Sequence, residues 1–185
     1  MMDPELQNEK RRYLDNEVLT LTIQGAHSTR GVPVYTDNRH SEPLKQFVRC
    51  RLPELGSKYR GGSVSDLKHI QNIEGLANDL TAHFHAILHG QKFRIGISQK
   101  LLNLYLKYQW VLGWIPEPPH CLFDFVVIRK LKLPQRISWT EMDSREDYLI
   151  LVNAVRKIAQ HAGLSIASWE LREWSGPSGR GTTSK

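Results

Sequence analysis

Cysteines and long apolar runs are both scarce in this sequence. Only Cys50 and Cys121 occur among 185 residues, so the chain has neither a disulfide framework nor a four-cysteine zinc site. Apolar runs such as "LFDFVVI" fall far below the roughly 18 residues that span a bilayer. The N-terminal stretch "MMDPELQNEKRRYLD" is charged and lacks the apolar region of a signal peptide. We therefore expect a cytoplasmic protein with no membrane insertion.

Several familiar catalytic signatures are also missing. The sequence contains no P-loop, no Rossmann glycine fingerprint, no G-x-S-x-G elbow and no kinase motif set. These absences disfavour nucleotide hydrolysis and the common hydrolase chemistries. The sequence does have an excess of basic residues, with 25 Lys and Arg against 19 Asp and Glu, which gives a net charge of +6. Such a charge mildly favours a polyanionic partner.

Helical periodicity dominates the chain after residue 61. Apolar residues at helical spacing predict helices from Ser65 to Gly90 and from Ser98 to about Leu112. A third is predicted between Thr140 or Ser144 and Gly163, and a short last one in "SIASWELREW", while "CLFDFVVIRKLKL" is compatible with helix or strand. We predict a mainly α-helical, compact domain of about five helices.

The two ends of the chain have a different character. Residues 1–17 are polar, "VLTLTIQG" alternates like a short strand, and one short helix is suggested near Leu44 to Val48. The last eleven residues, "SGPSGRGTTSK", are rich in Gly, Ser and Thr. We therefore expect a partly disordered N-terminal arm over 1–60, a helical domain over 61–174 and a disordered tail over 175–185.

The stretch "RIGISQKLLNLYLKY" carries two lysines on an otherwise apolar helix. Because each helical residue turns about 100°, Lys100, Asn103 and Lys107 share one stripe about 60° wide. One interpretation is that both amines are solvated, with their stems lying along apolar neighbours. The other is that one lysine is a desolvated, nucleophilic amine. The preceding turn, with Gly96 and Ser98, would also expose backbone N–H groups that suit a phosphate.

The order of these features resembles the helix-hairpin-helix DNA glycosylases, particularly the bifunctional oxoguanine-type branch. The resembling region runs from Phe93 to about Leu133, with Gly96 and Ser98 at the hairpin glycines. By this resemblance Lys100 is the nucleophile that attacks the sugar and Asp124 is the assisting aspartate, with Lys107 as the alternative amine. A flipped base would stack on an aromatic residue such as Trp110 or Trp114.

The resemblance implies DNA, rather than RNA, as the partner and a Schiff-base mechanism that needs no cofactor. Residues expected to contact nucleic acid come from the turn, the polar stripe and the basic segment "RKLK": Arg94, Gly96, Ser98, Asn103, Lys107, Arg129, Lys130 and Lys132.

Two alternatives remain open. The chain is also compatible with a non-enzymatic helical module that binds nucleic acid or protein, with the lysine stripe on phosphates. His85 and His89 stand one helical turn apart and, with His83, His120 and Cys121, suggest a mixed metal site, although a carboxylate in an H-E-x-x-H arrangement is missing. We expect no metal there.

Overall fold

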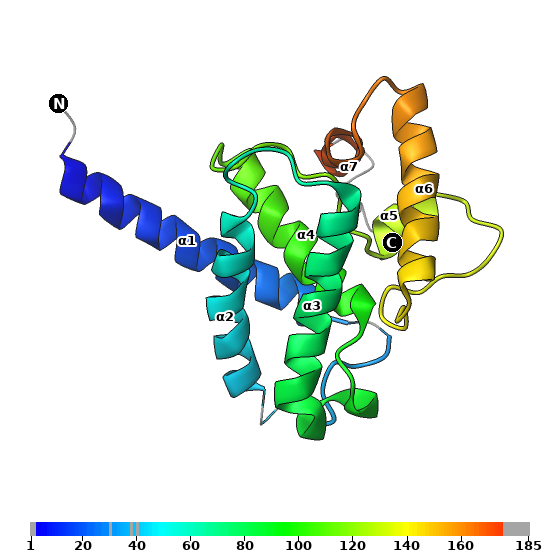
Figure 1. The fold of residues 1–185 in the computed structure, drawn as a ribbon, viewed down its shortest axis with the longest axis horizontal. Coiled ribbons are helices and arrows are strands. Elements are labelled where there is room, and N and C mark those ends of the chain that lie inside the picture. Colours follow the sequence, from blue (N-terminus) through cyan, green and yellow to red (C-terminus); the bar gives the residue numbers. More distant parts are fainter. Residues whose placement is uncertain (1–2, 30, 38, 40, 176–185) are drawn as a thin grey trace, which may run out of the picture.

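The computed structural model describes residues 3–29, 31–37, 39 and 41–175, and it is mainly helical. Two short 3-10 turns, η2 (His85–Ile87) and η3 (His89–Gln91), follow the third helix, and the described residues contain no β-strand. The seven α-helices, shown in Figure 1, are α1 (Pro4–His27), α2 (Glu42–Ser57), α3 (Asp66–Phe84), α4 (Ile95–Val111), α5 (Phe125–Lys130), α6 (Arg145–His161) and α7 (Ile166–Ser175). The predicted mainly helical class is confirmed, but the described residues form seven α-helices instead of about five.

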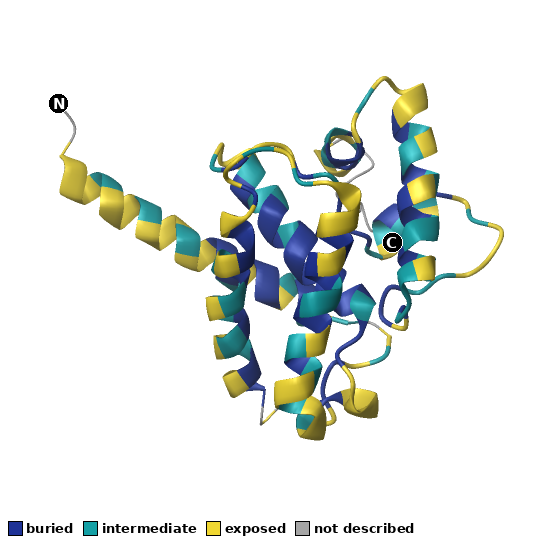
Figure 2. Ribbon diagram, in the orientation of Figure 1, coloured by how far each residue is buried: buried dark blue, intermediate teal, exposed yellow. Residues whose placement is uncertain are grey.

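Helix α4 is the centre of the fold. It packs against α1, α2, α3 and α6, and Figure 2 shows it buried along most of its length. Leu101, Leu102 and Leu106 are completely buried. A helix that is apolar around most of its circumference has to be enclosed in this way, so the predicted burial of α4 is confirmed.

The prediction of an N-terminal strand was wrong, because "VLTLTIQG" belongs to α1. A strand would bury Leu19, Leu21 and Ile23 together, whereas Leu21 is 46% exposed. The side chains that α1 buries follow helical spacing instead and face α4: Val18, Leu19, Thr22, Ile23 and Ala26. Packing against α4 therefore decides the conformation of a segment whose local pattern alternates.

The start of the chain is also more regular than predicted. Asp3 caps α1 by accepting a hydrogen bond from the Glu5 amide, and Pro4 occupies the first turn, where its missing N–H costs nothing. No residue of α1 before Val18 is buried, so this half of the helix projects from the body of the molecule (Figures 1 and 2). It is a helical arm, and not the irregular one expected.

Helix boundaries agree with the sequence at some ends and differ at others. Ser65 and Ser144 cap α3 and α6 as expected, and Gly163 has the positive φ of a residue that follows a helix. Helix α4, however, begins at Ile95 rather than at Ser98. The short helix expected near Leu44 is a full-length α2, and the predicted tail lies, apart from Ser175, outside the described residues.

Within the described residues, no helix combines the length and apolar character that a membrane crossing requires.

Candidate active site

A cavity of about 680 Å³ opens where the end of α1, the first turns of α4 and two later loops meet. Its wall includes both residues of the predicted reactive pair, Lys100 from α4 and Asp124 from the segment before α5. The other lining residues are Gly25, Ser28, Gly31, Phe125, Val126, Arg136, Ser138, Trp139 and Thr140. Lys100 and Asp124, which are 24 positions apart in the sequence, therefore line the same cavity.

Lys100 lies half-buried against an aromatic wall. Its Nζ is 4.0 Å from the centre of the Trp139 ring, a contact that favours the charged amine. Burial lowers the pKa of Lys100, and the nearby charge of Asp124 opposes that shift. The amine is thus easier to deprotonate than an ordinary surface lysine, while a carboxylate stands close enough to influence it.

Asp124 has a structural role as well as an electrostatic one. One of its oxygens, Oδ1, accepts a hydrogen bond from the Val127 amide at 3.0 Å and caps α5. The cap orients the side chain at the start of the helix, beside the cavity that Lys100 also lines. The same carboxylate can therefore hold the helix end and affect the lysine.

Lys107 lies in different surroundings from Lys100. Its Nζ forms an ion pair with Glu170 of α7 at 2.8 Å, and the two side chains are only 13% and 2% exposed. The Lys107 amine also lies 5.3 Å from the Trp174 ring centre. Because Lys107 is absent from the cavity wall and already paired, the structure favours Lys100 over the alternative amine.

The turn expected to grip a phosphate does not offer free N–H groups. Gly96 and Ser98 are buried residues of the first turns of α4. The Gly96 amide donates to the Met142 carbonyl at 2.8 Å, and the Ser98 amide donates to the Arg94 carbonyl at 3.1 Å. The Ser98 hydroxyl donates to the Ile73 carbonyl. An added Cβ at Gly96 would lie 1.7 Å from the Trp139 carbonyl oxygen, so this glycine serves close packing.

Two other residues expected to contact nucleic acid are also engaged inside the protein. The Arg94 guanidinium donates to the carbonyls of Val32 and Pro33. Asn103 is 1% exposed, its Oδ1 pairs with His69 Nε2, and its Nδ2 donates to the Cys121 carbonyl. Neither side chain is available to a polyanion in this conformation.

The basic segment after Asp124 is more accessible. Lys130 forms an ion pair with Glu173 at 2.5 Å, whereas Arg129 and Lys132 are exposed. Arg129 lies over the Phe125 ring at 5.6 Å, and Phe125 itself is 66% exposed. An exposed aromatic side chain with basic neighbours thus stands at the mouth of the cavity.

The histidines that the structure describes do not form a metal site. Among the described residues, no three His, Cys, Asp or Glu side chains are grouped so as to hold a metal ion. His83 packs against Phe47, with ring centres 4.9 Å apart, and its Nδ1 pairs with the Asp79 carbonyl. His120 is fully buried and bonded to Tyr148. The mixed site suggested by the spacing is therefore not assembled.

The sequence did not identify the aromatic residue of the cavity. Trp110 and Trp114 were expected to stack on a base, but the ring of Trp114 is covered by the Arg11 guanidinium at 3.4 Å. Trp139 lines the cavity instead, together with Arg136, and both come from a loop that has no repeating pattern. Only the folded chain brings that loop beside α4.

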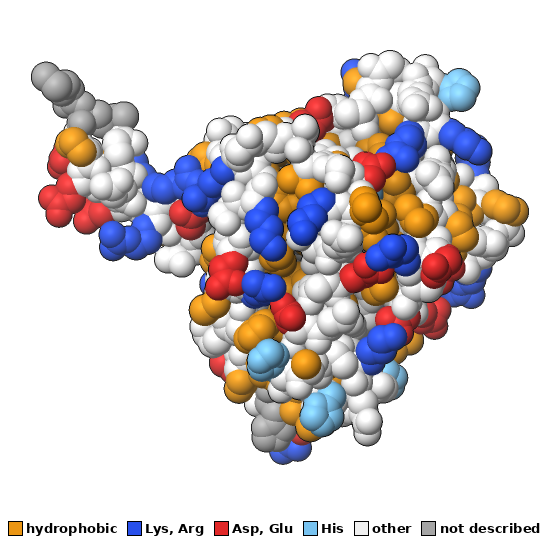
Figure 3. Space-filling model, viewed as in Figure 1, with side chains coloured by type: hydrophobic (Ala, Val, Ile, Leu, Met, Phe, Trp, Pro, Cys, Tyr) orange, Lys and Arg blue, Asp and Glu red, His pale blue; other side chains and the backbone are white. Residues whose placement is uncertain are grey.

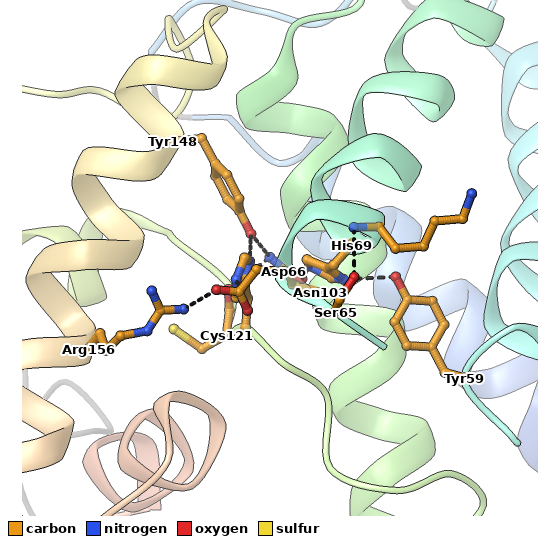
Figure 4. Close-up of polar contacts among 10 residues, drawn as sticks. Tyr59, Ser65, Asp66, His69, Asn103, Cys121, Tyr148 and Arg156 are labelled. Atoms are coloured by element: carbon orange, nitrogen blue, oxygen red, sulfur yellow. Dashed lines mark hydrogen bonds and ion pairs between the residues drawn. The ribbon is translucent and has the colours of Figure 1, made fainter. Parts of the chain in front are cut away.

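A second polar feature lies in the core. The Tyr59 hydroxyl bonds His69 Nδ1 at 2.8 Å, and His69 Nε2 bonds Asn103 Oδ1 at 2.8 Å. Asn103 Nδ2 also reaches the Tyr148 hydroxyl at 3.3 Å, and this hydroxyl bonds His120 Nδ1 at 2.9 Å. Figure 4 shows this buried network, which links α3, α4 and α6.

Both histidines of the network are held neutral. Burial lowers the pKa of His120 to about 4 and also lowers the pKa of His69 well below its ordinary value. The contacts agree with this state, since Asn103 Oδ1 can only accept, so His69 Nε2 carries the proton and its Nδ1 accepts from Tyr59. The last ring nitrogen of the network, His120 Nε2, lies 3.3 Å from Asp66 Oδ1.

No protein-family model, curated protein or solved structure matches this chain.

Proposed function

We propose that the protein acts on DNA at a damaged or abasic nucleotide, as a glycosylase and lyase that uses Lys100 as its amine nucleophile. The observation that carries the proposal is that Lys100 and Asp124 line one cavity. The resemblance to the helix-hairpin-helix glycosylases supports the same pair of residues.

The proposed chemistry begins with a neutral amine. Lys100 Nζ forms a bond to the sugar C1′ while the bond from C1′ to the base breaks, and the base leaves with the electron pair. The nitrogen then loses a proton, its lone pair forms the C=N bond as the C1′–O4′ bond breaks, and the ring oxygen takes up a proton, which gives a protonated Schiff base with the opened sugar. Elimination then removes a proton from C2′ and breaks the bond from C3′ to the phosphate oxygen. Asp124 accepts the proton that Lys100 releases and stabilises the cationic sugar.

The size of the cavity supports this use. A volume of about 680 Å³ falls within the roughly 300–1,000 Å³ typical of small-molecule sites. A nucleotide must leave the base stack before an enzyme can reach its C1′, and flipped bases are commonly held by aromatic side chains. Trp139 would supply that contact, while Arg136 on the same wall would meet a flanking phosphate.

Borohydride trapping on an oligonucleotide with one abasic site tests the proposal. Reduction of the Schiff base should give a covalent adduct with the native protein, and Lys100→Ala should abolish it. Lys157→Ala removes an exposed lysine of α6 and is the matched control. The absence of any adduct with the native protein, or an undiminished adduct in Lys100→Ala, would overturn the proposal.

A non-enzymatic module is the second candidate, favoured by the exposed group of Phe125, Arg129 and Lys132. Figure 3 shows acidic and basic side chains interspersed over the face in view, so that face carries no continuous basic field. A pure binding module predicts DNA binding that weakens steeply with salt and no adduct. The enzyme predicts that Asp124→Asn loses turnover but keeps binding.

A further inference from the structure

The residues that come directly before Lys100 and Asp124 are bonded to each other. Gln99 is completely buried, and its Nε2 donates to the Phe123 carbonyl at 2.7 Å. Its Oε1 accepts from the Phe123 amide at 3.0 Å. This two-point contact resembles the pairing of neighbouring strands, with a side-chain amide in place of the second strand.

The rest of this amide group is also engaged. Gln99 Nε2 donates to the Gly96 carbonyl at 3.0 Å, and Oε1 accepts from Asn103 Nδ2 at 3.2 Å. Asn103, one turn further along α4, donates to the Cys121 carbonyl at 2.8 Å. A side-chain amide has two donors and one acceptor oxygen with two lone pairs. Because all of those of Gln99 are used, the side chain cannot rotate without breaking hydrogen bonds in the core.

We propose that Gln99 and Asn103 are positioning residues, which hold the extended segment 121–123 against α4 and so fix Asp124 opposite Lys100. Consecutive Cα atoms are about 3.8 Å apart. Locking Phe123 to Gln99 therefore leaves Asp124 and Lys100 each only one residue from a rigid contact.

A merely structural role would look different in an experiment. A buried hydrogen bond contributes only modestly to stability, and apolar side chains cover most of the surface of α4 without such bonds. If Gln99 served stability alone, its loss would lower the unfolding free energy and leave the pKa of Lys100 unchanged. Losing a positioning amide would also move Asp124, whose charge raises the pKa of Lys100. The pKa of Lys100 is thus the quantity that separates the two roles.

The test measures that pKa without DNA. The pH dependence of reductive methylation by formaldehyde and cyanoborohydride is followed at the peptide that contains Lys100. Asp124→Asn should lower the Lys100 pKa, because it removes an opposite charge. Gln99→Met should lower it in the same direction, by about half a unit or more. The double variant should shift no further than Asp124→Asn alone, because both changes remove one interaction.

The chain offers a matched control and a second variant. Gln109 is also a buried glutamine of α4, and its side-chain nitrogen has no hydrogen-bond partner in the described part of the chain. Gln109→Met should leave the Lys100 pKa at its native value. Asn103→Ala removes the bonds of Asn103 to the Cys121 carbonyl, Gln99, His69 and Tyr148, but it leaves both Gln99–Phe123 bonds in place. This variant should therefore give a smaller shift, and it serves if Gln99→Met fails to fold. Arg136, the other charge on this wall, is unchanged in every variant.

An unchanged Lys100 pKa in Gln99→Met and in Asn103→Ala would overturn the inference. A pKa shift in Gln99→Met/Asp124→Asn equal to the sum of the two single shifts would also overturn it. The inference rests on the proposed function only for the claim that Lys100 is the reactive amine. This titration uses no DNA, so a negative trapping experiment would remove the proposed function and leave the positioning role intact. Conversely, an unchanged Lys100 pKa in the variants would remove the positioning role and leave the proposed function intact.

Discussion

Lys100 and Lys107 stand two turns apart on α4, on one stripe of the helix, yet they differ in what surrounds them. Lys100 shares a cavity with Asp124 and faces the Trp139 ring. Lys107 is locked in an ion pair with Glu170. Asn103, which lies between them, points into the core and joins the buried network. The stripe is therefore not one polar surface, and its members have three separate roles.

The Lys107 ion pair gives a prediction about stability. Lys107→Met should lower the unfolding free energy by about 3–5 kcal/mol, because it leaves a buried carboxylate unpaired. Burial already raises the pKa of Glu170, so the deficit should shrink at acid pH, where Glu170 can be buried in its neutral form. Urea unfolding at pH 7 and at pH 5 measures both effects. If the double variant Lys107→Met/Glu170→Leu is no more stable than Lys107→Met, the unpaired Glu170 carboxylate is not the cause of the lost stability.

At the scale of the element, α4 owes its position to a close contact at its first turn. Gly96 meets the backbone of Trp139 and Met142, and this contact brings the loop that carries Trp139 beside Lys100. Gly75, in contrast, lies in the middle of α3 with open space where a Cβ would be. Substitution by alanine should therefore have opposite effects on stability at Gly96 and at Gly75.

Gly96→Ala should destabilise the protein by about 3 kcal/mol or more, because the new methyl group overlaps a backbone carbonyl that cannot move without shifting the loop. Gly75→Ala should stabilise it by about 0.5–1 kcal/mol through the lower entropy of the unfolded chain. Thermal and urea unfolding of the two variants checks the pair. Equal effects of the two substitutions would contradict the close contact at Gly96.

The sequence predicted the helices whose apolar faces follow a clean 3.6-residue period, such as α3 and α6. It misread α1, whose residues Val18 to Ile23 alternate locally and become helical by packing on α4. In the cavity, the pairing of Lys100 and Asp124 was expected from a sequence resemblance. Trp139 and Arg136 were not, because they lie on an irregular loop whose position depends on long-range contacts such as that with Gly96.

At the scale of the whole molecule, the core contains buried, neutral histidines rather than apolar side chains alone. His69 and His120 are completely buried, with ring centres 4.7 Å apart. The network reaches the surface near Asp66, which pairs with Arg156 at 2.5 Å (Figure 4). Protonating either ring would place a buried charge beside the other, so the fold depends on both remaining neutral.

This dependence predicts how stability changes with pH. In the unfolded chain a histidine takes up a proton near pH 6.5. In the folded protein burial lowers the pKa of His120 to about 4 and lowers the pKa of His69 well below its ordinary value. The unfolding free energy should therefore fall as the pH drops below about 6.5, by up to about 1.4 kcal/mol per unit for each histidine. Urea unfolding between pH 7 and 5 measures the slope. His27, whose pKa burial also lowers to about 4, adds to this slope, and a flat profile would contradict the buried neutral pair.

Peptide mapping of the borohydride-trapped complex tests the central claim most directly. Abasic-site DNA is trapped on the native protein, the complex is digested, and the peptide that carries the reduced sugar is sequenced by mass spectrometry. The proposal predicts the modification at Lys100, the cavity amine opposite Asp124. Modification of Lys107, of a surface lysine or of no lysine at all would contradict it.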